Sequence, residues 1–525
     1  MLYFSELSTT FLEARIKKNI PVTKKKVPTK TPVNSNPDII YIIIYFFIII
    51  KIYNTLMNIF IFHRDLRIND NTTLIKMIKD QGAIIPIFIF TNDQILKTNN
   101  KYFSSNSVQF MIESLHELAD AIKEKNGKIY FFTGDNIKIL ESIHKEYKIN
   151  SIGYNIDYTP YARKRDNEIN MWAKDNNIKI ICEEDYALYN ILDNQTINQT
   201  TKSAYLVFTP FKKYCMKNLI IRKPDKFNSF HFLKKDDVNN SKYYMKRKDI
   251  DKFYTINKDI NVNGGRKNGL KILSNINNFV QYDNKRDSLT YKTTFLGAHN
   301  HFSTVSIREV YHKILDKLGK TNGLINELHW RDFYINITYF YPRILHGQVH
   351  GKNKALKEKY DAIKWSYNLK LFKLWCNGRT GFPIIDAAMN QLNITGFMHN
   401  RCRMVVASFL TKDLHIDWRM GEQYFATKLV DYDPMSNSGG WQWSASTGAD
   451  SQPYFRIFNP WSQQIKFDKD CEYIKKWLPC LESVPAKDIH KWFETYEKYK
   501  DIKYYKPIID HTEEKDKTLK MFKEI

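Results

Sequence analysis

Four dense motifs in the C-terminal half contain the residues best suited to chemistry. They are ELHWRDFY from Glu327, WCNGRTGFPIIDAAMNQL from Trp375, GFMHNRCRM from Gly396 and DYDPMSNSGGWQWSASTGAD from Asp431. Taken alone, the charged residues of these motifs are equally well explained as surface ion pairs, the commoner fate of such side chains. A single tryptophan is likewise more often a core residue than a redox centre. A specific function therefore depends on the motifs as a set.

The N-terminal half contains the elements of a layered α/β domain. Between its short apolar runs lie helical patterns, clearest over 107–125, where apolar residues recur at helical spacing. The runs predicted as strands are 58–62, 84–90, 128–132, 151–154 and 178–182. This alternation predicts a doubly wound parallel sheet covered by helices on both faces. The first strand is followed by FHRDLRINDN, so the usual glycine-rich dinucleotide fingerprint is missing.

The C-terminal half is predicted to be mainly α-helical. Its helical patterns cover 304–318, 324–341, 382–392, 399–410 and 421–429. Before them, a polar stretch over 234–269 is typical of a linker or a long surface loop. We therefore predict four parts, an extension over 1–56, an α/β domain over 57–188, a linker over 189–275 and a helical domain over 276–525.

The first 56 residues differ from the rest of the chain. A basic tract over 15–30 precedes an apolar run, Ile39–Ile50, that is shorter than the roughly 20 residues a membrane span needs. A run long enough to span a membrane would have to include residues 58–62, which are predicted to form a strand. We expect a dispensable extension, with Met57 as the functional start and no stable membrane partner. A membrane anchor is the alternative.

Composition favours an intracellular protein with a polyanionic partner. The 80 Lys and Arg against 56 Asp and Glu give a formal charge of +24, which suits nucleic acid or an anionic membrane surface. The six cysteines form no C-x-x-C pair and have no spacing suited to zinc, so we expect no metal site. Scattered cysteines fit a reducing compartment. We expect a monomer.

Together the four motifs resemble the photolyase/cryptochrome family, and most closely its class I cyclobutane pyrimidine dimer photolyases. The resemblance runs from Met57 to the C-terminus and implies an α/β domain followed by a helical domain that holds FAD. The FAD contacts that it implies are Tyr282, Thr293, Thr294, Leu296, Gly297, Arg331, Asn400, Arg403, Asp431, Asp433 and Asn437. Among them, Arg403 and Asp431 would pair beside the flavin ring, and Asn437 would face flavin N5. The phosphate-binding segment departs from the family pattern at Phe295, Gly297 and Ser303, and a threonine helix cap is its alternative.

Three tryptophans match the family's electron-transfer chain to the flavin, namely Trp365, Trp418 and Trp441. On the substrate side, the resemblance implies Glu327, Asn400 and Met404 as dimer-binding residues. The flanking aromatics would be Trp330 and Trp443, and the residues near the DNA backbone would be Arg286, Arg401 and Arg456. From composition alone, Lys412 and Lys428 are expected on the same positive rim.

The activity implied by this resemblance is light-dependent repair of pyrimidine dimers in DNA. Reduced FAD would pass an electron to a dimer flipped from the duplex, the cyclobutane ring would open, and the electron would return. The 6-4 photolyases and animal cryptochromes are expected to carry histidine at Asn400 and Met404, so the sequence favours cyclobutane dimers. A signalling cryptochrome without repair activity is the alternative.

A second, antenna chromophore is left open. The stretch YNIDYTPYARKRD from Tyr154 lacks the Asn-Glu pair that folate-binding members of the family use. A deazaflavin, a flavin or no antenna remain as alternatives.

Overall fold

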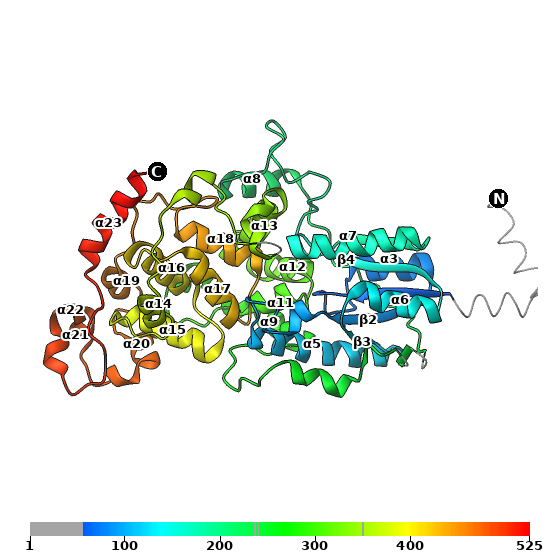
Figure 1. Ribbon diagram of the computed structural model, residues 1–525, viewed down its shortest axis with the longest axis horizontal. Helices are drawn as coiled ribbons and strands as arrows, with labels where there is room; N and C mark the ends of the chain where they lie inside the picture. Colours follow the sequence, from blue (N-terminus) through cyan, green and yellow to red (C-terminus); the bar gives the residue numbers. More distant parts are fainter. Residues whose placement is uncertain (1–55, 236–237, 240, 349–350) are drawn as a thin grey trace, which may run out of the picture. The chain divides into compact units, whose positions relative to one another are not determined.

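The computed structural model describes residues 56–235, 238–239, 241–348 and 351–525 (Figure 1). The predicted N-terminal extension, including its apolar run, lies outside the described residues. Within the described part of the chain, no helix is both long enough and apolar enough to cross a bilayer.

A six-stranded sheet forms the centre of the N-terminal domain, with the strand order β5-β4-β1-β2-β3-β6 (Figure 1). Five strands are parallel, namely β1 (Met57–Phe62), β2 (Ile85–Phe90), β3 (Tyr130–Thr133), β4 (Ile149–Ile156) and β5 (Lys179–Glu184). One face of the sheet packs on α3 (Thr72–Gln81) and α5 (Ser105–Glu124), and the other on α6 (Asn136–Glu146) and α7 (Pro160–Asp175). Burial on both faces explains the nearly continuous apolar runs. The predicted doubly wound sheet is confirmed.

The stretch 189–275, predicted as a linker, contains regular structure. Helix α8 (Phe208–Asn218) and helix α9 (Arg266–Ser274) lie in it. The short strand β6 (Tyr244–Met245) pairs antiparallel with β3 and forms one edge of the sheet. The segment is thus partly built into the α/β domain.

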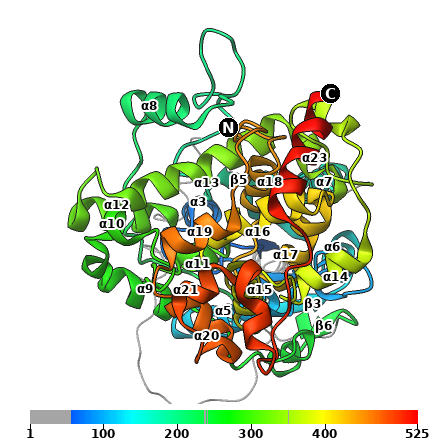
Figure 2. The same cartoon turned by 90° about the vertical axis from the view of Figure 1, so that its left-hand side faces the viewer.

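The C-terminal domain is helical, as predicted, and Figure 2 views it from the side on which its last helix lies. The helices that position the candidate site are α11 (Leu296–His301), α12 (Ile307–Leu318), α13 (Gly323–Phe340), α15 (Pro383–Thr395), α16 (Asn400–Ser408), α17 (Trp418–Lys428) and α18 (Pro434–Ser444). Helix α16 continues into a π-helical turn, η6 (Phe409–Asp413), on which α23 (His511–Lys523) packs. A large apolar core around Trp375, Phe425 and Trp441 holds α15, α16, α17 and α18 together, and a second core contains the buried faces of α12 and α13.

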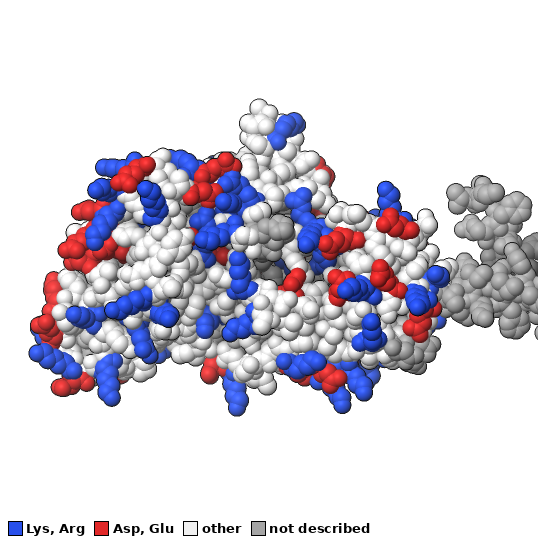
Figure 3. All heavy atoms as spheres, viewed as in Figure 1, with Lys and Arg blue, Asp and Glu red and all other residues white. Residues whose placement is uncertain are grey.

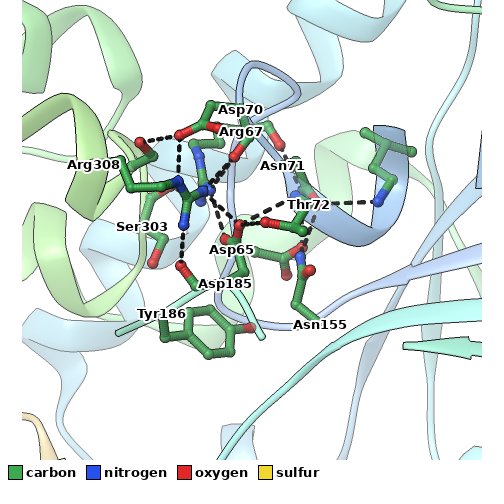
Figure 4. Close-up of polar contacts among 12 residues, drawn as sticks. Asp65, Arg67, Asp70, Asn71, Thr72, Asn155, Asp185, Tyr186, Ser303 and Arg308 are labelled. Atoms are coloured by element: carbon green, nitrogen blue, oxygen red, sulfur yellow. Dashed lines mark hydrogen bonds and ion pairs between the residues drawn. The ribbon is translucent and has the colours of Figure 1, made fainter. Parts of the chain in front are cut away.

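A buried ion network joins the two domains (Figure 4). Arg67, which follows β1, places Nη2 2.6 Å from Oδ2 of Asp185, which follows β5. Arg308 of α12 bridges Asp185 and Asp70, at 2.7 Å from each carboxylate. Burial alone would raise the pKa of Asp185, but Arg67 and Arg308 hold that pKa below its ordinary value. Because every buried charge here has a partner, removing one would leave another unpaired at high cost, so the network fixes how the domains dock.

Candidate functional site

Three elements of the helical domain converge on Asp431. Nη2 of Arg403, on α16, donates to both carboxylate oxygens of Asp431 at 2.9 and 3.1 Å. A second nitrogen of Arg403 donates to the carbonyl of Met398 at 2.8 Å, which fixes the guanidinium plane. A Cβ on Gly297, in α11, would lie 2.9 Å from Asp431 Oδ2. The glycine therefore allows α11 to approach this ion pair closely.

Asp433 is the N-cap of α18 and the centre of a second charged group. Its Oδ1 accepts from the backbone N–H of Ser436 at 2.9 Å. Its Oδ2 lies 3.2 Å from Nδ1 of His301 and 3.3 Å from Nη1 of Arg64. Burial opposes ionisation, but His301, Arg64 and Arg331 together hold the pKa of Asp433 far below its ordinary value. Asp433 is therefore a fixed negative charge.

Asn437 lies one turn further along α18. Its amide nitrogen donates to the side chain and the carbonyl of Glu422, on α17, at 3.0 and 3.1 Å. Glu422 is fully buried, and burial raises its pKa to about 8. With the amide nitrogen engaged, the oxygen of Asn437 is left as a hydrogen-bond acceptor, the role that an N–H such as flavin N5–H requires.

The residues implied for FAD fit such a group. Next to these residues, Oδ1 of Asn300 is buried without a hydrogen-bond partner in the protein. Arg331 donates to the carbonyls of Tyr186 and Asn300, at 2.6 and 3.4 Å. Donors, acceptors and a close-approach glycine thus lie on α11, α16 and α18, the set that a large polar cofactor needs.

The segment that the resemblance implies for phosphate binding has an unusual backbone. Phe295 takes a left-handed conformation with φ 56° directly before α11, and the N–H of Leu296 donates to the hydroxyl of Thr294 at 3.3 Å. Thr293 is half-buried beside them, and Tyr282 is buried at the start of a short helix. Phe295 packs edge-on against Phe397, with ring centroids 5.0 Å apart. This contact explains how a phenylalanine is held in a conformation that favours glycine.

The three tryptophans lie on neighbouring, packed segments. Trp418 begins α17, and a Cβ on Gly421 would lie 2.1 Å from the Trp441 ring, so that ring lies directly on α17. The residue after Trp365 pairs with the segment before α17, because the N–H of Ser366 donates to the carbonyl of His415 at 2.7 Å. The exposed fractions of Trp365, Trp418 and Trp441 are 8%, 0% and 3%. All three are therefore shielded from water.

Residues implied for the substrate form a chain of contacts. Arg286 lies 3.2 Å from Glu327, and its neighbour Asp287 lies 2.6 Å from Arg401. On α16, the Asn400 amide approaches the Met404 sulfur to 3.9 Å. Burial raises the pKa of Glu327, although Arg286 opposes the shift. A raised pKa favours a carboxyl that can donate a hydrogen bond to a pyrimidine.

The flanking aromatics differ in their surroundings. Trp330 stacks on Phe208 of α8, with centroids 3.7 Å apart and an interplanar angle of 7°. Trp443, on α18, is half-buried, two residues after the buried Trp441. Arg456 is exposed in the loop that follows α18. The structure thus places Trp330 and Trp443 on helices and Arg456 on a loop.

The prediction that Lys412 adds to a positive rim is wrong. Lys412 is 1% exposed and donates to the Ser446 hydroxyl at 2.8 Å and to the Arg456 carbonyl at 3.3 Å. Burial lowers its pKa to about 8. Lys412 therefore holds the loop of Arg456 through a partly buried hydrogen bond. Lys428, in contrast, is partly exposed. Across the face shown in Figure 3, Lys and Arg are prominent and acidic residues are interspersed among them.

The residues of the site that were not anticipated from the sequence include Arg64, Phe208, His301 and Glu422. Arg64 lies in FHRDLRINDN, a motif that stood out only because it lacked glycines. No local sequence pattern marks Phe208, His301 or Glu422 as site residues, because each contacts a partner that is distant in sequence. Glu422, for example, looks like an ordinary helix-surface residue until α18 packs against α17.

Comparison with known proteins identifies the family. Residues 58–228 match the family model described as DNA photolyase, and residues 324–524 match the FAD binding domain of DNA photolyase. A deoxyribodipyrimidine photo-lyase of Buchnera aphidicola is 35% identical over 89% of this chain and 98% of its own length. The crystal structure of an archaeal photolyase from Sulfolobus tokodaii with two FAD molecules has a TM-score of 0.78 and 36% identity, covering 89% of this chain and 100% of that one.

A cryptochrome shares this fold. A cryptochrome from Synechocystis has a TM-score of 0.76 at 24% identity and covers 89% of this chain and 99% of its own. This likeness concerns the fold alone. Taken with the photolyase matches over nearly the whole described chain, the sequence and the structure agree that this protein belongs to the DNA photolyase family and carries its FAD-binding domain.

Proposed function

We propose that the protein is a class I photolyase that uses reduced FAD and light to split cyclobutane pyrimidine dimers in DNA. One observation carries the proposal. Asn400, Arg403 and Met404 are spaced so that they share one face of α16, and Arg403 is paired with Asp431. The residues implied for the dimer and the ion pair implied for the flavin are therefore neighbours. Such proximity suits direct electron transfer between the two.

When bound and reduced, FAD supplies an electron donor that light can excite. The chain's own residues would then bind and orient the dimer. Burial shifts the pKa of Glu327 upward, and a carboxyl shifted in this direction is better able to share a proton with a pyrimidine carbonyl. Trp330, Trp443 and Met404 offer apolar surface for a flipped dimer, and Arg286 and Arg401 supply positive charge for the DNA backbone. The fixed charges Arg403 and Asp433 act strongly because the site is partly buried.

The second candidate function is that of a cryptochrome-type light receptor without repair activity. The shared fold supports it. Glu327, Asn400, Met404 and Trp443 favour repair instead, because a receptor that repairs nothing has no need of a dimer-binding set. The two functions therefore differ in what happens to damaged DNA.

A repair assay separates these functions. The reduced, FAD-loaded protein would be illuminated with an oligonucleotide containing one cyclobutane thymine dimer, beside a dark sample and an oligonucleotide with a 6-4 photoproduct. We expect restored thymines only in the illuminated cyclobutane sample. Binding without restoration would contradict the enzyme and favour the receptor, and repair of the 6-4 photoproduct would contradict the substrate assignment.

A cavity in the α/β domain is our proposed site for a second chromophore. It has a volume of about 360 Å³ and is lined by residues that follow β2 and β3 and by Tyr161, Lys164, Arg165 and Glu168 of α7. Ligands of open parallel sheets bind at this carboxyl edge. The archaeal photolyase with two FAD molecules shows that a relative can hold a second flavin. Extraction of the purified protein should give more than one chromophore per chain; a single FAD per chain would contradict the proposal.

A further inference from the structure

The loop after β1 lies at the point where the order of the sheet reverses. From β1 the chain adds β2 and β3 on one side, then β4 and β5 on the other, so the reversal falls between β1 and β4. In open parallel sheets the crevice at such a point usually binds a ligand. Arg64 follows β1 and Asp157 follows β4, so this ion pair lies at the carboxyl ends of the two strands between which the order reverses.

Arg64 is fixed within the α/β domain by three contacts. Its Nε lies 2.8 Å from one Asp157 oxygen, and its Nη2 lies 3.2 Å from the other. Its guanidinium carbon lies 4.2 Å from the centre of the Tyr186 ring. The side chain is buried and cannot move without breaking these contacts. Arg64 is therefore a rigid donor.

The remaining terminal nitrogen of Arg64 reaches the helical domain. Nη1 lies 3.3 Å from Oδ2 of Asp433, which is 369 residues away in the chain. The same carboxylate oxygen lies 3.2 Å from His301, and its partner oxygen caps α18. The orientation of Asp433 is thus set partly from within its own domain and partly from outside it. Together these contacts fix the orientation of the Asp433 carboxylate and stabilise its negative charge.

We infer that Arg64 is a positioning residue of the flavin site, through which the α/β domain holds Asp433 for the cofactor. The inference rests on the proposed function, because it takes Asp433 as a flavin contact. Beyond that function, FAD affinity would depend on the docking of the two domains. Binding of FAD and formation of the domain interface then strengthen each other, as reciprocal linkage requires.

The test is to replace Arg64→Gln and measure the dissociation constant and midpoint reduction potential of FAD. We expect binding about tenfold to a hundredfold weaker, the range for loss of one charge-assisted hydrogen bond. Asp157→Asn, which loosens Arg64 without touching Asp433, should give a smaller loss. Arg247→Gln is the matched control, since Arg247 pairs with Asp120 on the α/β surface and should leave both quantities unchanged. Unchanged FAD affinity in Arg64→Gln would overturn the inference.

A double-mutant cycle shows whether Arg64 acts through Asp433. In an Asp433→Asn background, adding Arg64→Gln should change FAD affinity by less than threefold. Equal effects of Arg64→Gln in both backgrounds would overturn the inference, because Arg64 would then act independently.

Arg64→Lys distinguishes a specific loss of FAD affinity from a loss of folding. Lysine keeps the positive charge but cannot reach both carboxylates. We expect it to keep the melting temperature and the cooperative transition of the parent while binding FAD more weakly. Parental FAD affinity in this variant would also overturn the inference. Failure of the unaltered protein to bind FAD would instead contradict the proposed function.

Discussion

Two adjacent glycines of α18 should respond in opposite ways to alanine. A Cβ on Gly439 would lie 2.2 Å from Cδ1 of Tyr334, whereas a Cβ on Gly440 would have no atom within 4 Å. Both positions are helical, where alanine is favoured over glycine by about 1 kcal/mol. The two substitutions therefore differ in packing alone.

The size of the stability loss in Gly439→Ala depends on how tightly the Tyr334 ring is packed. Its ring packs against Trp330 and Phe333, with centroids 5.8 and 5.7 Å away, so it cannot move aside freely. Overpacking of this kind costs about 1–3 kcal/mol, and a 2.2 Å approach favours the upper end. After the gain in helix propensity, Gly439→Ala should lower the free energy of unfolding by about 2 kcal/mol, and Gly440→Ala should raise it by up to about 1 kcal/mol.

Calorimetric melting of the two variants is the assay. For a chain of this length, 1 kcal/mol corresponds to about 1 °C in melting temperature, so the variants should differ by about 3 °C. Gly439→Ala should also weaken binding of a dimer-containing oligonucleotide, because Tyr334 contacts Trp330. Equal melting temperatures, or Gly440→Ala as the less stable variant, would refute the packing argument.

Three further predictions concern the site. Asn400→His should lower dimer repair at least tenfold more than FAD affinity; an equal loss of both would place Asn400 on the flavin side. Trp418→Phe should abolish photoreduction of oxidised flavin but leave repair intact after chemical reduction, and flash spectroscopy of each step decides this. Because the pKa of Glu422 is raised to about 8 by burial, its protonated form stabilises the fold at low pH, and this contribution is lost as pH rises from about 4.5 through 8. The melting temperature of the unaltered protein should therefore fall relative to Glu422→Gln between pH 5 and 8, and a constant difference would contradict the burial argument.

Strand β2 was predictable because burial on both faces makes it an uninterrupted apolar run. The run 84–90 becomes β2 (Ile85–Phe90). Helices α12, α13, α15 and α17 lie close to their predicted bounds. Helix α12 has a clear apolar face, whereas α13 is buried on most of its surface. Local patterns are sufficient for such elements. The segment 189–275 was harder, since α8 is held by long-range packing against Trp330 and Phe333.

Contacts across the domain interface could not be predicted. Arg64 meets Asp433 only after both domains have folded and docked, so no local pattern indicates the pair. Lys412 was misplaced for a related reason. Composition alone suggested an exposed lysine, but α16 becomes π-helical at η6, and α23 packs on that turn. Chain segments remote in sequence decide both outcomes.

In the proposed function, a flavin site and a dimer site built on α16 and α18 carry out light-driven repair without net redox change. The most direct measurement counts dimers repaired per bound flavin during continuous illumination of the reduced protein, without added reductant and without oxygen. We expect many dimers per flavin, with the flavin spectrum unchanged at the end. Repair that stops at one dimer per flavin, or that proceeds equally in the dark, would contradict the proposed function.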